Sequence, residues 1–541
     1  MNQLLAGLGV LALVSAACAA SVVLRYCWNV WYDARALSAL PWVGLRNELF
    51  PTIRACLRNR TDGLRLVFDG YKRYSKNGRF FVTPCWWSRC VVAVPPEHLP
   101  WFIKELDNKG TPPQKALHTK VQSIVLRDQP KGEFVHNSLM PGLKRFSPAD
   151  IWALIQQSFA EESLGGSAAA ADGFWTTASI MEDVIAMPLT RMLVGAFYGN
   201  GLDRDTAFVH NSIRYICTSN MFTYKVSAFV PEILYPVLYG AVALQHDYYK
   251  WKFDRQLVPL VKRRLAEMDA VGGASSKAGS GPPPDLLSYY IKAVSKSKDA
   301  KDRDPYVASA RFSMILSGFS FATLSGALFA VLSKLVGRRE DIAVLESEAA
   351  GAVAKGEEWT AQSVASLVHL DSFIKEVLRH ITFNGFGLAL MRCVDAAEGI
   401  KLPRGAGTSG DIVLPRGTWV GMPVDAMHRD DSVFEAADEF RPWRFVELAQ
   451  RQQHQDGEEE LTKAFLRNSM IATTDEYLAF GRGKATCPGR FFASDVLKLW
   501  LAYIVLNYDI AAPAEAMPSD GGNVSMRIRR KRKTSAPPAS P

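Results

Sequence analysis

Cys487 is the residue whose neighbours point most directly to chemistry. It lies in the stretch FGRGKATCPGR, residues 480–490, which we call the cysteine loop, and the apolar run FFASDVLKLWLAYIVL follows. Pro488 suits the first position of that helix, where its missing N–H costs nothing. A cysteine at a helix N-terminus is predicted to favour the thiolate, and three flanking cations act in the same direction: Arg482, Lys484 and Arg490. Such a thiolate is either a nucleophile or a metal ligand.

Three other interpretations of the cysteine loop fit the sequence less well than a nucleophile or a metal ligand. Gly481 and Gly483 begin a dinucleotide-binding pattern, but residue 486 is threonine where the third glycine should stand, and no βαβ unit follows. A phosphate-binding loop would need a Gly-Lys-Ser/Thr step, which is absent. An ordinary buried cysteine would explain neither the glycines nor the basic flank. A nucleophile would need a histidine base nearby in the fold, which the sequence leaves open.

The elements that must position this loop are predicted to be mostly helical. Apolar residues recur at intervals of three and four over 148–265 and again at 371–381. Residues 307–336 carry few charges but many small and hydroxyl side chains, so a buried core helix is favoured over a second membrane span. Short strand-like pieces stand between 79 and 96 and between 388 and 424. The Gly/Ser/Pro-rich stretch 271–284 predicts a surface loop.

The first 24 residues contain no charged side chain, and an uncharged run of this length can form a membrane-spanning helix. A cleaved signal peptide is the alternative, but a basic leader is missing and the apolar run is long for one. Arg25 and Arg35 follow the run, so the positive-inside rule places the rest of the chain in the cytosol. We therefore expect an uncleaved single-pass anchor.

Composition limits the remaining classes. The chain has 541 residues, eight scattered cysteines and a net charge of +9. The cysteines suggest neither a disulfide framework nor a zinc site, so a reducing compartment is expected. Part of the charge comes from the tail RIRRKRKTS, which is predicted to be solvated and frayed. No zinc-finger spacing or recognition helix supports a nucleic-acid partner.

The cysteine loop resembles the haem-binding signature of the cytochrome P450 family, Phe-x-x-Gly-x-x-x-Cys-x-Gly. Three upstream segments match that family in the right order. The helix 307–336 resembles its central distal helix, EVLR resembles its Glu-x-x-Arg helix, and FRPWRF resembles its Pro-x-Arg-Phe segment. The resemblance covers roughly residues 40–510 and is closest to filamentous-fungal, membrane-bound members.

This resemblance implies a mainly α fold with a small β-rich lobe, behind an N-terminal transmembrane helix. It divides the chain into an anchor at 1–25, a haem-thiolate monooxygenase domain at 40–510 and a basic C-terminal tail at 511–541. It also implies a buried charged triad that braces the cysteine loop, made of Glu376, Arg379 and Arg444. Without the resemblance, Glu376 and Arg379 would be read as a surface i,i+3 pair.

The implied cofactor is haem b, with the Cys487 thiolate as the axial ligand of its iron. Phe480 would shield that ligand, and three glycines would let the backbone approach the porphyrin and the sulfur: Gly481, Gly483 and Gly489. The haem propionates need basic donors. Arg392 is the first candidate, and His428 and His136 are further ones for which a structural role is favoured. The family usually has histidine or arginine at the position of Ala485, so Lys484 or Arg482 is expected to replace it.

In the distal helix, the resemblance assigns Thr323 as the alcohol that helps deliver protons to bound dioxygen. The residue before it is Ala322, where the family has an acidic residue or histidine. Ser320 and Ser325 are the alternative residues to hold a water chain. Either protons arrive through water or substrate hydroxyls, or the enzyme performs a rearrangement or desaturation. Without the resemblance, Thr323 would be a buried residue bonded to its own helix.

The implied function is monooxygenation of a lipophilic small molecule, as a tailoring step in fungal secondary metabolism on a terpenoid or polyketide-derived scaffold. Electrons would come from a separate NADPH-dependent flavin reductase, which four cations could steer: Arg482, Lys484, Arg490 and Lys498. Single-pass placement in the endoplasmic reticulum membrane is expected, with the catalytic domain cytosolic. The alternative is a membrane-anchored haem protein with electron-independent rearrangement activity or no catalysis.

Overall fold

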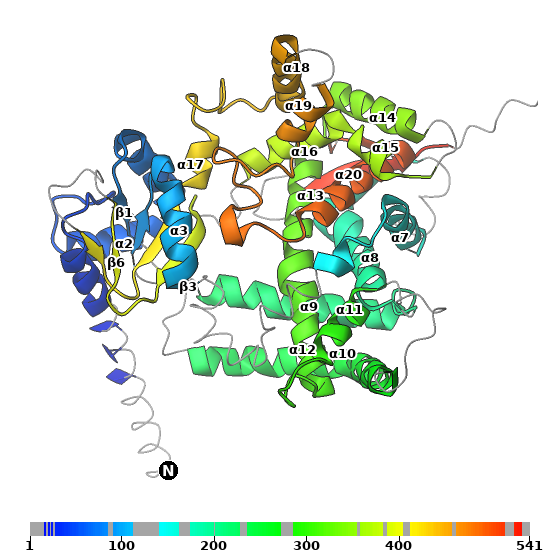
Figure 1. Cartoon of the computed structure of the whole chain (residues 1–541), viewed down its shortest axis with the longest axis horizontal. Coiled ribbons are helices and arrows are strands. Elements are labelled where there is room, and N and C mark those ends of the chain that lie inside the picture. Colours follow the sequence, from blue (N-terminus) through cyan, green and yellow to red (C-terminus); the bar gives the residue numbers. More distant parts are fainter. Residues whose placement is uncertain are drawn as a thin grey trace, which may run out of the picture.

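A computed structural model gives the architecture of the chain. It describes residues 16–17, 20–21, 23–24, 27–84, 90–111, 140–161, 174–199, 201–227, 235–271, 285–353, 358–381, 387–403, 412–456, 461–513 and 524–532. A large helical body lies beside a smaller lobe that contains most of the strands (Figure 1). The predicted mainly α fold with a small β-rich lobe is therefore confirmed.

One helical column runs through the middle of the helical body (Figure 1). It consists of α12 (Pro305–Met314), a π-helical segment (Ile315–Phe321) and α13 (Ala322–Leu335). Asp304 caps the column by accepting hydrogen bonds from the backbone N–H groups of Tyr306 and Val307. The predicted core helix at 307–336 thus exists, but the sequence did not predict its π-helical segment.

The remaining helices of this body lie around the column, and most of them bury one continuous apolar core with it. They are a π-helix (Ile180–Ala186), α7 (Pro148–Glu161), α8 (Met187–Tyr198), α9 (Thr206–Ser227), α10 (Tyr235–Val271), α11 (Leu286–Val294), α14 (Arg339–Val353), α15 (Ala361–Ala365), α16 (Val368–His380), α18 (Arg444–Asp456), α19 (Leu461–Asn468) and α20 (Arg490–Asn507). Trp500 of α20 is among its largest fully buried side chains. The predicted surface loop at 271–284 falls almost entirely outside the described residues.

The smaller lobe is built on a five-stranded sheet in the order β1-β2-β8-β5-β3. Among the described strands of this sheet, β2 and β8 pair in parallel and the other neighbours are antiparallel. The strands are β1 (Phe81–Thr83), β2 (Val91–Ala93), β3 (Gly110–Thr111), β5 (Ala389–Val394) and β8 (Trp419–Met422). A two-stranded pair, β6 (Ile400–Lys401) and β7 (Val413–Leu414), adjoins them in sequence. The lobe also contains α2 (Pro51–Arg73), α3 (Leu99–Lys109) and α17 (Val424–His428). Sequence segments before residue 112 and after residue 388 therefore meet in this lobe.

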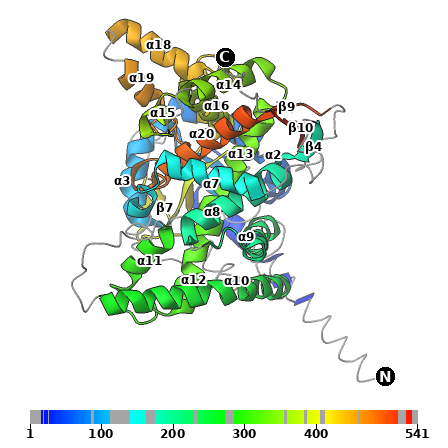
Figure 2. The same cartoon turned by 90° about the vertical axis from the view of Figure 1, so that its right-hand side faces the viewer.

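A third sheet corrects the prediction of a frayed C-terminal tail. Strand β10 (Ser525–Arg530) pairs with both β4 (Thr176–Ser179) and β9 (Tyr508–Ala511), and Figure 2 shows the three together. Met526 and Ile528 are buried, whereas the alternate arginines remain accessible. The tail sequence was interpreted as a charge run because Ile528 lies between Arg527 and Arg529. Residues 525–530 are structured despite their charge.

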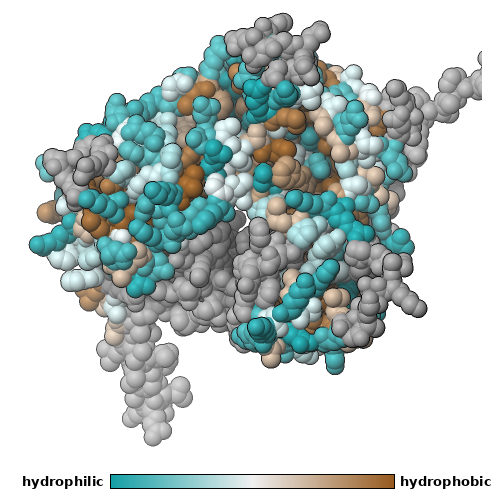
Figure 3. Space-filling view, viewed as in Figure 1, coloured by the Kyte–Doolittle hydropathy of each residue, from teal (hydrophilic) through white to brown (hydrophobic). Residues whose placement is uncertain are grey.

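No helix in the described part of the chain is long and apolar enough to cross a membrane. Most of residues 1–25, where the anchor is predicted, fall outside that part. Hydrophilic side chains cover much of the face drawn in Figure 3, and apolar side chains reach that surface in separate groups.

Candidate active site

The cysteine loop folds back on itself through two residues with left-handed backbone. Gly481 has φ 75° and Gly483 has φ 64°, a region that disfavours residues with a Cβ. The backbone N–H of Cys487 then donates to the carbonyl oxygen of Phe480 at 2.8 Å. A Cβ on Gly483 would also lie 2.6 Å from Cγ2 of Ile103. Both glycines are therefore required by the local backbone itself.

Cys487 does not lie directly at the start of α20. The helix begins at Arg490 and its cap residue is Gly489, so the prediction that Pro488 occupies the first helical position is wrong. A short turn separates the cysteine from the helix, in which the N–H of Arg490 approaches the carbonyl oxygen of Cys487 at 3.4 Å.

The electrostatic surroundings of Cys487 are mixed. Burial raises the pKa of its thiol, although the Gly489 backbone N–H and the Arg490 charge both act to lower it. In the chain by itself, burial therefore outweighs the two groups that favour the thiolate. A bound metal ion would supply the missing positive charge.

Glu376, Arg379 and Arg444 lie together and are buried. Arg379 donates from Nε and Nη2 to the two carboxylate oxygens of Glu376, each at 2.8 Å. Arg444 donates from Nε to the same carboxylate at 3.0 Å and 3.2 Å. Burial raises the pKa of Glu376, but its hydrogen bonds, led by that from Arg379, outweigh this effect and bring the pKa to about 2. The carboxylate is therefore held in its charged form.

The two arginines also bind backbone carbonyl groups at the end of α17 and in the segment that follows it. Arg379 donates to the oxygens of His428 and Ala437, the latter at 2.7 Å. Arg444 donates to the oxygen of Glu439 at 3.0 Å. The triad thus joins α16 to an irregular segment upstream of the cysteine loop.

A second face of α16 holds the segment that leads directly into the loop. Asp371 accepts a hydrogen bond from the N–H of Met470 at 2.7 Å, and Lys375 donates to the oxygen of Asn468 at 3.0 Å. Sequence analysis missed these two residues. Their signal was available, because positions 371 and 375 of a helix share one face, as 376 and 379 share another.

His428 is placed as a structural residue. Its Nε2 accepts a hydrogen bond from the N–H of Leu478 at 3.0 Å. Its ring stacks on that of Tyr477, with 5.3 Å between the ring centres. Burial lowers its pKa to about 3, so the ring is neutral at physiological pH. The geometry thus favours the structural role over that of a cationic propionate donor. His136, the weaker candidate, lies outside the described residues.

Arg392 lies on β5 and pairs with a protein carboxylate. Its Nη2 is 3.1 Å from Oδ1 of Asp107, and both side chains are almost fully buried. The other oxygen, Oδ2, accepts a hydrogen bond from the backbone N–H of Lys484 at 3.1 Å. Sequence analysis did not single out Asp107, which is 285 residues from Arg392 in the chain.

The four cations proposed to steer a reductase have different surroundings. Lys484 is exposed and donates to Asn108 at 2.8 Å, and Arg482 pairs with Asp475 at 2.8 Å. Lys498 is buried and donates to the oxygen of Val364 at 3.0 Å. Its assignment to a partner-facing surface is therefore wrong, because α20 turns this side chain into the core.

Thr323 lies where the π-helical segment passes into α13. Its hydroxyl donates to the oxygen of Ser320 at 3.2 Å, and that of Ser320 donates to the oxygen of Ile315 at 3.1 Å. Ala322, Thr323 and Gly326 are exposed although the column runs through the centre of the body. A Cβ on Gly326 would meet nothing within 4 Å. Open space therefore lies along this face of α13.

The residues present fit a haem group. Cys487 is part-buried and the Gly489 N–H is directed at it. The α13 part of the helical column has an open face of small residues. A Cβ on Gly489 would come no closer to the chain than 3.6 Å, at Leu143. The protein packing itself therefore leaves room at that position, where a flat cofactor could approach.

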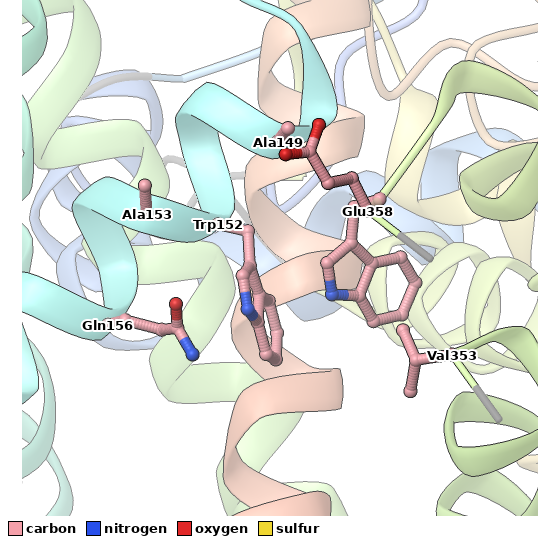
Figure 4. Close-up of a pocket in the computed structure, with 7 residues that line it drawn as sticks. Ala149, Trp152, Ala153, Gln156, Val353 and Glu358 are labelled. Carbon is pink, nitrogen blue, oxygen red and sulfur yellow. The ribbon is translucent and has the colours of Figure 1, made fainter. Parts of the chain in front are cut away.

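Figure 4 draws a different pocket of about 460 Å³. Its lining comes from α7, from Val353 at the end of α14 and from the chain just before α15, and the rings of Trp152 and Trp359 are 5.1 Å apart between their centres. No lining residue belongs to the cysteine loop, the central column or β5. This pocket is therefore separate from the candidate site.

Comparison with known proteins decides the family. A model of the cytochrome P450 family matches residues 183–533, which is more than half of the chain. The chain belongs to the cytochrome P450 family. This P450 is 26% identical to the cytochrome P450 monooxygenase gloP of Glarea lozoyensis, over 88% of this chain and 87% of the relative. It is also 26% identical to fsoD of Humicola fuscoatra, over 88% of each chain, and 28% identical to efuH of Hormonema carpetanum, over 88% of this chain and 82% of that one. It is accordingly a P450 monooxygenase, an oxidoreductase.

Proposed function

We propose that this P450 holds haem b through the Cys487 thiolate and oxidises a lipophilic small molecule as a tailoring step in fungal secondary metabolism. The observation that carries the haem assignment is the geometry of the cysteine loop. Two left-handed glycines and the Cys487 N–H bond to Phe480 present the sulfur at one fixed place, with a backbone N–H directed at it. When bound, haem supplies reduction of dioxygen by two electrons, with one oxygen atom entering the substrate and the other leaving as water.

The chain's own residues would orient substrate and move protons. The Thr323 hydroxyl is exposed on the open face of α13, where it can accept a hydrogen bond from a bound group, or donate one by rotating away from the Ser320 oxygen. Ala322 beside it carries no titratable group, so protons must reach Thr323 through water or through a substrate hydroxyl. Small side chains at 322, 323 and 326 leave room for a bulky ligand, which suits a terpenoid or polyketide-derived scaffold.

Electrons would come from a separate NADPH-dependent flavin reductase. The exposed Lys484, with Arg482 on the same loop, provides positive charge for an acidic partner surface. A membrane anchor at 1–25 would place both proteins on the endoplasmic reticulum, with the catalytic domain in the cytosol. In support, Val23, Leu24 and Trp28 are at least 60% exposed. Apolar and aromatic residues of this kind suit a membrane interface.

Labelled dioxygen tests the proposed reaction. The full-length protein is combined with a P450 reductase and NADPH and incubated with a panel of terpenoids, polyketides, sterols and fatty acids under ¹⁸O₂. We expect one labelled oxygen atom in the product of a terpenoid or polyketide, and no product without NADPH. Conversion of sterols or fatty acids alone would refute the assignment to secondary metabolism.

Ala322 favours one second candidate, an electron-independent rearrangement. The same experiment separates the two functions, because a rearrangement gives an isomer of the substrate in the absence of NADPH and incorporates no label. A Thr323→Ala variant adds a check on proton delivery. If Thr323 acts as proposed, this variant consumes NADPH while forming less product, and Thr323→Ser restores the wild-type ratio.

A further inference from the structure

Asp107 connects three elements that converge beside the cysteine loop. It lies in the last turn of α3, and its side chain is only 6% exposed. One carboxylate oxygen pairs with Arg392 of β5, and the other accepts the backbone N–H of Lys484 in the cysteine loop, each at 3.1 Å. A single buried carboxylate therefore has both of its oxygens occupied by groups from different parts of the chain.

The packing around Asp107 leaves little freedom. Strand β3 follows α3 directly and pairs with β5, with Gly110 opposite Val394. A Cβ on Gly110 would lie 3.1 Å from Cβ of Arg392, so the end of α3 lies against that residue. The next side chain of α3, Asn108, accepts a hydrogen bond from Lys484 Nζ at 2.8 Å. The end of α3 thus contacts both β5 and the cysteine loop.

We propose that Asp107 is a positioning residue that fixes the cysteine loop against α3 and neutralises Arg392 beside it. Lys484 is three residues before Cys487. If its N–H lost this hydrogen bond, the loop would be less fixed and the Cys487 sulfur would occupy a wider range of positions. A charge-assisted bond to a backbone N–H is stronger than a neutral one. Removal of the carboxylate would also leave the nearly buried Arg392 guanidinium without its partner.

Hydrogen–deuterium exchange of the full-length protein tests the fixing of the loop. In Asp107→Asn, the amide of Lys484 should exchange about tenfold faster, which corresponds to the loss of about 1.4 kcal/mol of hydrogen-bond free energy. Glu105→Gln is the matched control, since Glu105 lies on the same helix and pairs only with the exposed Lys109 among the described contacts. The control should exchange like the wild type. Equal exchange in Asp107→Asn and the wild type would overturn the proposal.

The role of the charge has its own readout, which rests on the proposed ligation of haem by Cys487. Asp107→Asn leaves the Arg392 cation uncompensated, so the reduction potential of the haem should rise. Asp107→Glu keeps the charge and should restore the potential, which a purely structural role would not require. An unchanged potential in Asp107→Asn would refute the electrostatic role. If the wild type shows no thiolate-ligated haem, the proposed function fails, and the exchange experiment still decides whether Asp107 fixes the loop.

Discussion

At the scale of single residues, Glu376 is the clearest example of a buried charge that organises the site. Its carboxylate accepts hydrogen bonds from Arg379 and Arg444, and also from the backbone N–H of Arg441 at 3.0 Å. The two arginines continue to carbonyl groups of the segment after α17. One side chain thus links a helix, directly and through the two arginines, to the irregular stretch of chain between α17 and α18.

Glu376→Gln should destabilise the protein by about 3–5 kcal/mol, because two buried guanidinium groups lose their counter-charge. Urea unfolding measured at pH 7 would show the loss. Glu435→Gln is a suitable control, since Glu435 forms exposed pairs with Arg441 and Arg451 and should unfold like the wild type. If both variants unfold at the same urea concentration, Glu376 does not brace the segment.

His428→Leu should lower the free energy of unfolding by about 1–3 kcal/mol, because the buried N–H of Leu478 loses its hydrogen-bond acceptor. The folded pKa of His428 is about 3, so the ring is uncharged at every pH from 5 to 8. The unfolded chain, in contrast, has an ordinary His428 pKa of 6.5 and takes up a proton below that value, so this residue destabilises the wild type on acidification. The loss of stability caused by the substitution should therefore be largest at pH 8 and smaller by about 2 kcal/mol at pH 5. We would compare urea midpoints at three pH values. A loss that grows on acidification would indicate a protonated His428 and a role as a cationic donor.

At the scale of elements, the cysteine loop depends on its contact with α3. Gly483→Ala should destabilise the protein by about 1–2 kcal/mol from its left-handed backbone alone, with a further cost from the contact with Ile103. Gly351→Ala in α14 is the matched control. A Cβ there meets nothing within 4 Å, and alanine favours helix, so its stability should equal or exceed that of the wild type. Thermal unfolding would separate the two, and equal melting temperatures would contradict this account of the loop.

At the interface of α16 and α20, Asp495 makes a contribution to stability that depends on pH. Burial raises the pKa of Asp495 on α20 from 3.8 to about 6. The folded chain therefore binds this proton more tightly than the unfolded chain, and stability is lost as the pH rises from about 4 to about 6. Asp495→Asn should abolish that loss. Relative to the wild type, the free energy of unfolding of the variant should be higher by on the order of 2 kcal/mol at pH 7 and little changed at pH 4. An equal difference at both pH values would contradict the shifted pKa.

At the scale of the whole molecule, features set by neighbouring residues could be predicted from the sequence. The glycines of the cysteine loop, the i,i+3 pair of Glu376 and Arg379, and the apolar central helix are each visible within a few turns of chain. Such local patterns predicted that the chain is mostly helical, whereas the fold class with its β-rich lobe came from the family resemblance. The proximity of Arg444 to Glu376 came from the family resemblance instead, since 68 residues separate them.

Features set by tertiary packing could not be predicted in the same way. The partner of Arg392 is Asp107, and only the pairing of β3 with β5 brings them together. Lys498 is buried because of the direction in which α20 packs, which its sequence alone does not determine. The sequence of strand β10 did contain a signal, since apolar and charged residues alternate with the period of a strand over 526–529, but the net charge of the tail masked this pattern.

The account rests on Cys487 as the ligand of haem iron, and one spectrum tests this most directly. The full-length protein in microsomes is reduced with dithionite, exposed to carbon monoxide and compared with Cys487→Ala and with Cys217→Ala, a control cysteine in α9. We predict a strongly red-shifted Soret band in the wild type and in Cys217→Ala, and its loss in Cys487→Ala. A red-shifted band that survives in Cys487→Ala, or haem that binds to the wild type without such a band, would contradict the assignment.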